Sequence, residues 1–190
     1  MRMPTAALVC SLSGIIAAAT VAAQTPATPP ASPVVLPGPN RISFPADYAK
    51  GVLYGTVDRA DNKQYRELYV SPPEAIDAAK KGEPLPRGTV LTLVQYRAQL
   101  DADGNPVKDA GGRFIKGDLV AYTVMEKREG WGSEIPESIR NGEWEYQAFT
   151  AARTANPKAD LANCYTCHKP LDKDDYVFTY DRLKAFAKAN

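Results

Sequence analysis

The chain has 190 residues, with 23 basic side chains, 22 acidic side chains and a formal net charge of +1. A chain so close to neutral has no field that would attract nucleic acid or anionic lipid, and we expect neither as a partner. The length suits one domain with a hydrophobic core of its own.

The N-terminal residues 1–23 have the pattern of a secretory signal peptide. Arg2 gives a positive start, residues 6–23 are almost free of polar side chains, and Val21 and Ala23 are small enough for signal peptidase. We therefore expect cleavage after Ala23 and export to the periplasm. A retained membrane anchor is the alternative, but this stretch is short and weakly hydrophobic, and no later segment is apolar enough to span a membrane.

Residues 24–40 are rich in proline, alanine and threonine. Such a segment buries little apolar area, so we interpret it as a flexible tether. The folded domain is expected to occupy residues 41–190. Without residues 1–23, which contain one charged side chain, the exported chain would have 167 residues and no net charge.

The first half of the expected domain contains two strands and a helix. Residues 51–57 and 64–70 are rich in β-branched and aromatic side chains and are separated by a polar turn, which predicts paired strands. Ser71 and Glu74 have the spacing of a capping box, which predicts the start of a helix. Gly82 is a suitable residue to end that helix.

The second half contains three further predicted strands, at 89–99, 119–125 and 144–150, and a C-terminal helix at 181–189. Residues 129–141 are polar and irregular. The order of elements predicts an α+β fold, in which a mainly antiparallel sheet is joined by a few helices. We expect the cysteine pair to lie in a C-terminal loop.

One motif is strongly specific, and it reads Cys164-Tyr165-Thr166-Cys167-His168. This spacing is the attachment signature for c-type haem. Two thiols with two residues between them can form thioethers with neighbouring vinyl groups, and the following histidine binds the iron axially. We predict one covalently attached haem c, held by Cys164 and Cys167, with His168 as the metal ligand.

Three other interpretations of the motif are less consistent with the sequence. A structural zinc site needs four ligands, whereas the chain offers two cysteines beyond the predicted signal and a single histidine. A thioredoxin-type pair is expected within a βαβ unit, not close to the C-terminus. A plain disulfide would leave His168 without a role.

The sixth position of the iron is the next question. His168 is the only histidine, so a bis-histidine haem within one chain is excluded, and Met125 is the only methionine beyond the predicted signal. Met125 lies in an alternating strand pattern, where methionine is more often core than ligand. We therefore expect a five-coordinate iron with one open face, which suits gas binding or redox chemistry.

Several short segments between Phe44 and Phe186 have the order seen in one haem protein family. They are Phe44-Pro45 with Tyr48, Tyr65 to Val70, Gly88-Thr89-Val90, Trp144 to Phe149, the haem motif with Lys169, and Val177-Phe178-Thr179. In these segments the chain resembles the cytochrome P-460 family, which includes the β-sheet cytochromes c-prime. The resemblance implies a mainly antiparallel β fold, a homodimer and a periplasmic haem that binds or transforms small nitrogen compounds.

The resemblance also bears on activity. Members that oxidise hydroxylamine have a lysine cross-linked to the haem rim, a few residues after the Gly-Thr-Val element. Leu93 stands at that position and has no nucleophilic nitrogen. The chain is therefore more similar to the branch without the cross-link, in which apolar or aromatic residues cap the distal face and nitric oxide is a ligand.

Distal residues follow from the same resemblance. Arg66 aligns with a distal-side arginine of the family and is the candidate for a catalytic or ligand-binding donor, although a surface ion pair would explain it equally well. Leu93, Tyr96, Tyr146 and Phe149 are candidate pocket residues, with plain core packing as the alternative.

Three functions follow in order of preference. The first is a periplasmic five-coordinate haem protein that binds nitric oxide or a similar molecule. The second is a hydroxylamine-oxidising enzyme assisted by Arg66 or by an unassigned carboxylate. The third is an electron carrier, with a redox partner protein and with Met125 or a lysine as sixth ligand.

Overall fold

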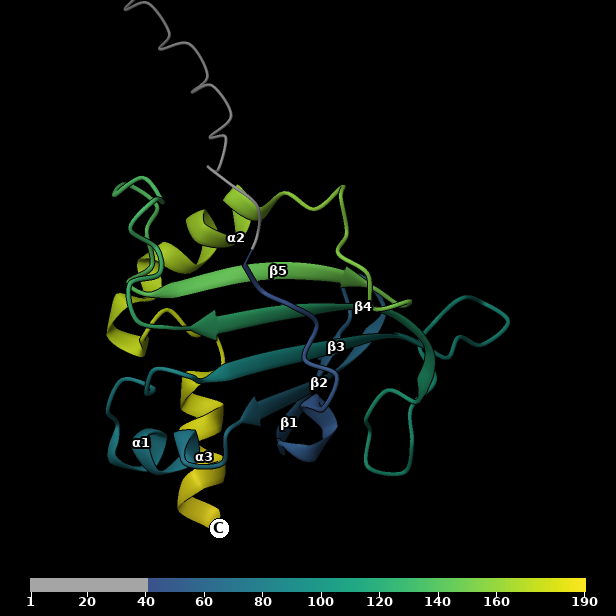
Figure 1. Cartoon of the computed structure of the whole chain (residues 1–190). Coiled ribbons are helices and arrows are strands. Elements are labelled where there is room, and N and C mark those ends of the chain that lie inside the picture. The colour runs from purple at the N-terminus through teal and green to yellow at the C-terminus, as the bar shows by residue number, and fades with distance from the viewer. Residues whose placement is uncertain (1–40) are drawn as a thin grey trace, which may run out of the picture. The chain divides into compact units, whose positions relative to one another are not determined.

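The computed structural model describes residues 41–190, so the predicted signal peptide and tether lie outside the described residues. One five-stranded antiparallel sheet forms the centre (Figure 1). Its strands are β1 (Val52–Arg59), β2 (Gln64–Ser71), β3 (Val90–Ala98), β4 (Lys116–Lys127) and β5 (Trp144–Thr150). Each strand pairs with the next one in sequence, as the predicted α+β fold with a mainly antiparallel sheet requires.

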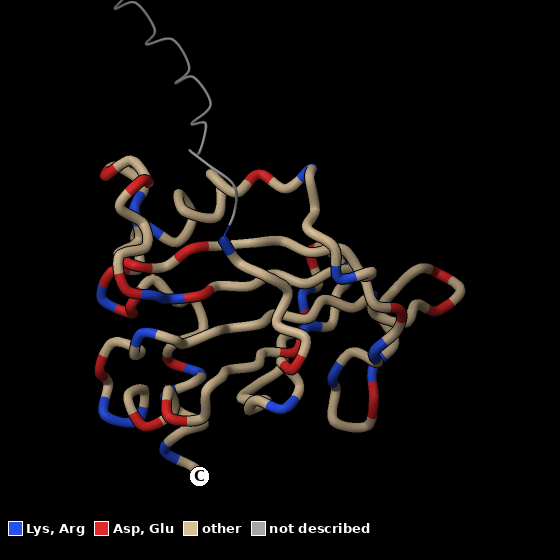
Figure 2. The backbone as a smooth tube through the Cα atoms, in the orientation of Figure 1, with Lys and Arg blue, Asp and Glu red and all other residues tan. Residues whose placement is uncertain are grey.

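The helical elements are η1 (Tyr48–Lys50), α1 (Ala75–Lys81), α2 (Leu161–His168), η2 (Lys169–Asp174) and α3 (Tyr180–Ala189). Helices α1 and α3 pack against each other and α3 contacts β1, whereas α2 lies beside β5 (Figure 1). Within residues 41–190, no helix has the length and apolar character needed to cross a membrane. Basic and acidic residues are interspersed along the described chain (Figure 2).

The sheet has two apolar faces because successive side chains of a strand point to opposite sides. One face packs with the helices into a cluster that contains Leu68, Leu91, Trp144, Tyr146, Tyr165 and Leu183. The other face has a second cluster, which contains Ile42, Val94, Tyr122, Val124 and Phe149. The segment from residue 41 to η1 crosses this second face (Figure 1), so each face has its own cover.

Helix α1 begins later than predicted. Ser71 is the last residue of β2, and the helix begins at Ala75 with no side-chain cap, so the predicted capping box does not form. The predicted end is confirmed, because Gly82 adopts a left-handed φ of 79° and its N–H donates to the carbonyls of Ala78 and Ala79.

The cysteine motif, which was expected in a loop, lies on α2. Asp160 precedes the helix in an extended conformation, and its Oδ1 accepts a hydrogen bond from the Asn163 N–H at 3.2 Å. This N-cap satisfies one of the free donors at the start of the helix. The sequence contained this signal, since an aspartate stands directly before a run of helix-compatible residues.

Helix α3 provides a test of the core. Leu183 has no exposed surface, whereas the side chain of Leu100 is half exposed. We expect Leu183→Ala to lower the free energy of unfolding by about 2–5 kcal/mol. The matched variant Leu100→Ala should change it by less than about 0.5 kcal/mol. Urea unfolding followed by circular dichroism measures both, and equal losses would show that α3 is not part of the core.

Candidate haem site

His168 and Cys164 both line one cavity of about 410 Å³ on the helix-covered face of the sheet. This volume is within the range of small-molecule and cofactor sites. Most of the lining side chains are apolar, and they include Val57, Leu68, Leu91, Leu93, Met125, Val177 and Phe178. The cavity is therefore suited to a flat, largely apolar group.

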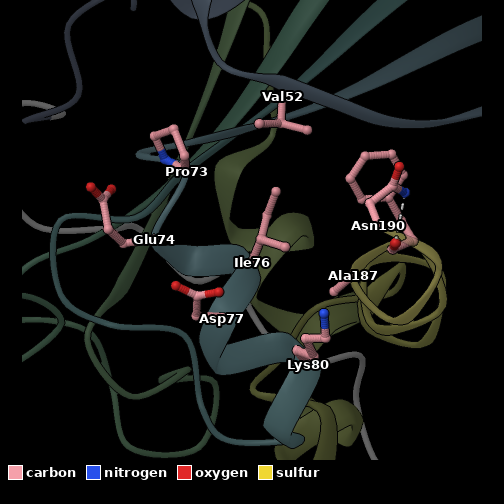
Figure 3. Close-up of a pocket in the computed structure, with 9 residues that line it drawn as sticks. Val52, Pro73, Glu74, Ile76, Asp77, Lys80, Ala187 and Asn190 are labelled. Atoms are coloured by element: carbon pink, nitrogen blue, oxygen red, sulfur yellow. Dashed lines mark hydrogen bonds between the residues drawn. The ribbon is translucent and has the colours of Figure 1, made fainter.

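A larger hollow, of about 510 Å³, lies between α1, α3 and the start of β1 (Figure 3). Its lining includes Val52, Ile76, Asp77, Lys80 and Ala187, but no cysteine or histidine of the described chain. Because this hollow has no cysteine or histidine, the smaller cavity beside α2 is the candidate haem site.

On helix α2, Cys167 and His168 come three and four positions after Cys164, so each of them is a neighbour of Cys164 on the helix surface. Cys164 is half-buried and lines the cavity, whereas Cys167 is exposed. Both thiols are free, so the two cysteines do not form a disulfide. Burial raises the pKa of Cys164 to about 11, which keeps this thiol neutral at physiological pH.

The imidazole of His168 is fixed by one short hydrogen bond. Its Nδ1 lies 2.6 Å from the carbonyl oxygen of Tyr176, and because a carbonyl can only accept, Nδ1 holds the proton. Burial lowers the pKa of His168, and the hydrogen bond to Tyr176 opposes this effect in part. The ring is therefore neutral with a free Nε2, which is the form that binds a metal ion.

Two aromatic side chains hold the ring from its sides. Tyr146 and Phe178 lie with their ring centroids 4.8 Å and 4.7 Å from that of His168. Asn141 is fully buried, and its Nδ2 donates to the Tyr146 hydroxyl at 2.8 Å and to the Tyr165 carbonyl at 3.1 Å. Asn141 thereby connects β5 to α2 beside the histidine.

The cavity brings together only part of the predicted pocket. Leu93 and Tyr146 line it. Tyr96 and Phe149 do not, contrary to the prediction, because they lie in the cluster on the opposite face of the sheet. Each stands three residues after a cavity residue in the same strand, and an odd separation in a strand reverses the face.

Arg66 lines the cavity, as the resemblance implied. Its Nε and Nη2 donate to Gln64 Oε1 at 2.9 Å and 2.7 Å, and no carboxylate of residues 41–190 lies within ion-pair distance. Burial and the nearby charge of Arg59 lower the pKa of Arg66, which stays far above neutrality for a guanidinium. Arg59 also lines the cavity and pairs with Asp61 at 2.6 Å.

Several lining residues of the cavity were not predicted from the sequence. Phe178 and Thr179 were noted only as part of the resemblance, and Tyr54, whose hydroxyl lies 2.8 Å from Thr179 Oγ1, was not singled out. The aromatic character of Tyr54 and Phe178 was visible in the sequence, but their position in the wall of the cavity was not. Among the described residues, no aspartate, glutamate or lysine lines the cavity.

The donor set fits a haem. Within residues 41–190, no group of three or more histidine, cysteine or acidic side chains is arranged to hold a metal ion. A single neutral imidazole beside a half-buried thiol and apolar walls would suit an iron whose other, protein-independent ligands come from a porphyrin. Fold and site together define a mainly antiparallel β protein with a haem-type binding cavity.

The model of the Cytochrome P460 family matches residues 45–179, which include all five strands and α2. The chain therefore belongs to the Cytochrome P460 family, and the predicted family is confirmed. Membership supports a haem-binding cytochrome of the c-type class. Comparison with curated proteins gives no match to this chain.

Tyr54, in the wall of the cavity, should make the stability of the protein depend on pH. Burial raises the pKa of Tyr54 to about 12 from 10.0, so the folded state disfavours the tyrosinate more than the unfolded state does. Its contribution to stability is complete below about pH 10 and is lost as the pH rises towards about 12, by roughly 3 kcal/mol in total. We expect Tyr54→Phe to lose less unfolding free energy than wild type between these pH values in urea titrations. Parallel losses in the two proteins would contradict this assignment.

Proposed function

We propose that the protein is a mono-haem c-type cytochrome with a five-coordinate iron that binds nitric oxide or a related small nitrogen ligand. The observation that best supports this proposal is the set of side chains that line the cavity. His168 offers one axial nitrogen, and the remaining walls, within the described residues, contain no carboxylate and no lysine.

Covalent attachment follows from α2. The thiol of each cysteine would add across a vinyl double bond of the porphyrin, so that a carbon–sulfur bond forms and the thiol hydrogen moves to the other vinyl carbon. Cys164 lines the cavity and Cys167 lies one turn further on, next to His168. The helix thus provides both thioether sulfurs and the axial nitrogen from adjacent turns.

A bound haem would supply an iron with a position for a small ligand. The residues of the chain then determine what reaches that iron. Leu68 and Leu93 exclude water and leave little stabilisation for charge on the ligand. Arg66 has five N–H donors, of which Gln64 occupies two, so its guanidinium can also donate to an iron-bound ligand.

The same walls disfavour the oxidation of hydroxylamine, because that reaction must remove protons from the substrate. The described lining residues include no carboxylate that would accept them. Leu93, which stands where the resemblance places the cross-linking lysine, lines the cavity as an apolar side chain. We therefore rank ligand binding above hydroxylamine oxidation.

One observation favours a second candidate. Met125 lines the same cavity as His168, so an electron carrier with methionine as the sixth ligand is the alternative. Met125 pairs across the sheet with Tyr146, which packs against His168. Met125 would therefore lie on the same side of a bound haem as His168, which would leave the position opposite the histidine open.

Export and assembly are part of the proposal. Residues 1–23 would direct the chain to the periplasm, where the haem would be attached, and the family resemblance supports a homodimer. A redox partner protein would be needed by the electron-carrier alternative. None of these steps calls for nucleic acid or, after signal cleavage, for a membrane.

Mass spectrometry of the full chain, expressed with a haem-attachment system, tests attachment and cleavage together. We expect the mass of a polypeptide without residues 1–23 plus one haem. Cys164→Ala and Cys167→Ala should each retain haem through a single thioether, and the double variant should release it into acidified organic solvent. A colourless protein, or one without added porphyrin mass, would refute the proposal.

Absorption spectra of the ferrous protein, with and without nitric oxide or carbon monoxide, test the open position. We expect a high-spin spectrum that changes on addition of either gas, and an unchanged spectrum in Met125→Leu, which keeps the volume of the wall. A low-spin spectrum that resists carbon monoxide, and becomes reactive in Met125→Leu, would establish the electron carrier. Turnover of hydroxylamine with a strongly red-shifted ferrous band would establish the enzyme.

A further inference from the structure

A buried ion pair lies behind the histidine, outside the cavity. Lys127 ends β4, and its Nζ lies 2.9 Å and 3.0 Å from the two carboxylate oxygens of Asp175. The two side chains are only 12% and 9% exposed. Leu85 completes the network, since its carbonyl accepts from Lys127 at 2.9 Å and its N–H donates to Asp175 at 2.9 Å.

This network holds a turn in an unfavourable backbone conformation. Asp175 and Tyr176 have φ values of 50° and 61°, and left-handed conformations of non-glycine residues persist only where surrounding contacts enforce them. The N–H of Tyr176 donates to the Leu171 carbonyl at 2.7 Å, which closes the turn after η2. The result is that the Tyr176 carbonyl points at His168 Nδ1.

Stability alone is a poor explanation for such a pair. Removing two charges from water costs free energy that their attraction repays only in good geometry, and hydrophobic replacements are often as stable. Lys127 also lies 5.4 Å from the centre of the Trp144 ring, where an apolar side chain would pack as well. The specific effect of the pair is to set the position of the 175–176 backbone.

We propose that Lys127 and Asp175 are positioning residues for the axial histidine, acting through the Tyr176 carbonyl. The inference rests on the proposed function, in which His168 binds the haem iron. A hydrogen-bond acceptor at Nδ1 raises the basicity of the imidazole and fixes its orientation. A firmly held carbonyl therefore strengthens the iron–nitrogen bond and stabilises the ferric state relative to the ferrous state.

The test compares two broken ion pairs in the haem-loaded protein. Lys127→Met removes the cation beside Asp175. Lys116→Met is the matched control, because Lys116 pairs with Glu67 at 2.7 Å on the opposite face, where the carboxylate is also 9% exposed. Asp175→Asn is the milder second variant, since asparagine tolerates the left-handed conformation and keeps one acceptor.

Two readouts follow the histidine itself. Resonance Raman spectra give the iron–histidine stretching frequency of the ferrous protein, and potentiometry gives the midpoint potential. We expect Lys127→Met and Asp175→Asn to lower the frequency and to shift the ferric–ferrous equilibrium towards the ferrous state by up to about tenfold, which is about 59 mV for one electron. Lys116→Met should leave both the frequency and the potential unchanged. Lys127→Arg, which keeps the positive charge, should shift both by less than Lys127→Met does.

The outcomes separate the inference from the function on which it rests. If wild type shows no iron–histidine band, the proposed function fails and the inference fails with it. If wild type shows the band, but Lys127→Met and Asp175→Asn lose only stability, the pair is merely structural and the inference is overturned.

Discussion

The hydrogen bond from His168 Nδ1 to the Tyr176 carbonyl, at 2.6 Å, is the interaction on which the site depends. It fixes the tautomer, so that Nε2 is the free nitrogen, and it joins the end of α2 to the turn after η2. Each partner is held from elsewhere: the Asp160 cap and the Asn141 amide hold α2, and the Lys127 network holds the turn. The protein surrounding the motif therefore supports a single orientation of one ring.

The alternation of side chains along the strands decides which residues meet that ring. From the sequence, the strands and their antiparallel order followed from alternation and short polar connections, and the family from scattered motifs. Alternation also contained the answer for the pocket: Leu93 and Tyr96 in β3, like Tyr146 and Phe149 in β5, are three apart and cannot face the same side. A pocket prediction that respected strand parity would have kept only one member of each pair.

Other features of the site could not be predicted, because they depend on tertiary contacts. The haem motif was visible since its chemistry requires two thiols and an imidazole within five consecutive residues. Lys127, Asp175 and Asn141 have no such local signature, and the Lys127–Asp175 pair spans 48 residues of sequence. Their importance arises from burial, and the local sequence around a lysine at a strand end does not predict that the side chain is buried. The same limit applies to α1, where Ser71 had suitable spacing but pairing with β3 extended β2 through it.

The two sides of the proposed haem would control different quantities. On the histidine side, the carbonyl and the ion pair behind it would set the electron density that the imidazole gives to a bound iron. On the other side, apolar walls and the charge of Arg66 would influence which ligands enter, since Arg59 is already paired with Asp61. Arg66 would disfavour cations, whereas a neutral diatomic molecule meets neither charge repulsion nor a large desolvation cost. A firmly held imidazole and a cavity without a carboxylate in its described lining would together favour reversible capture of such a molecule over its oxidation.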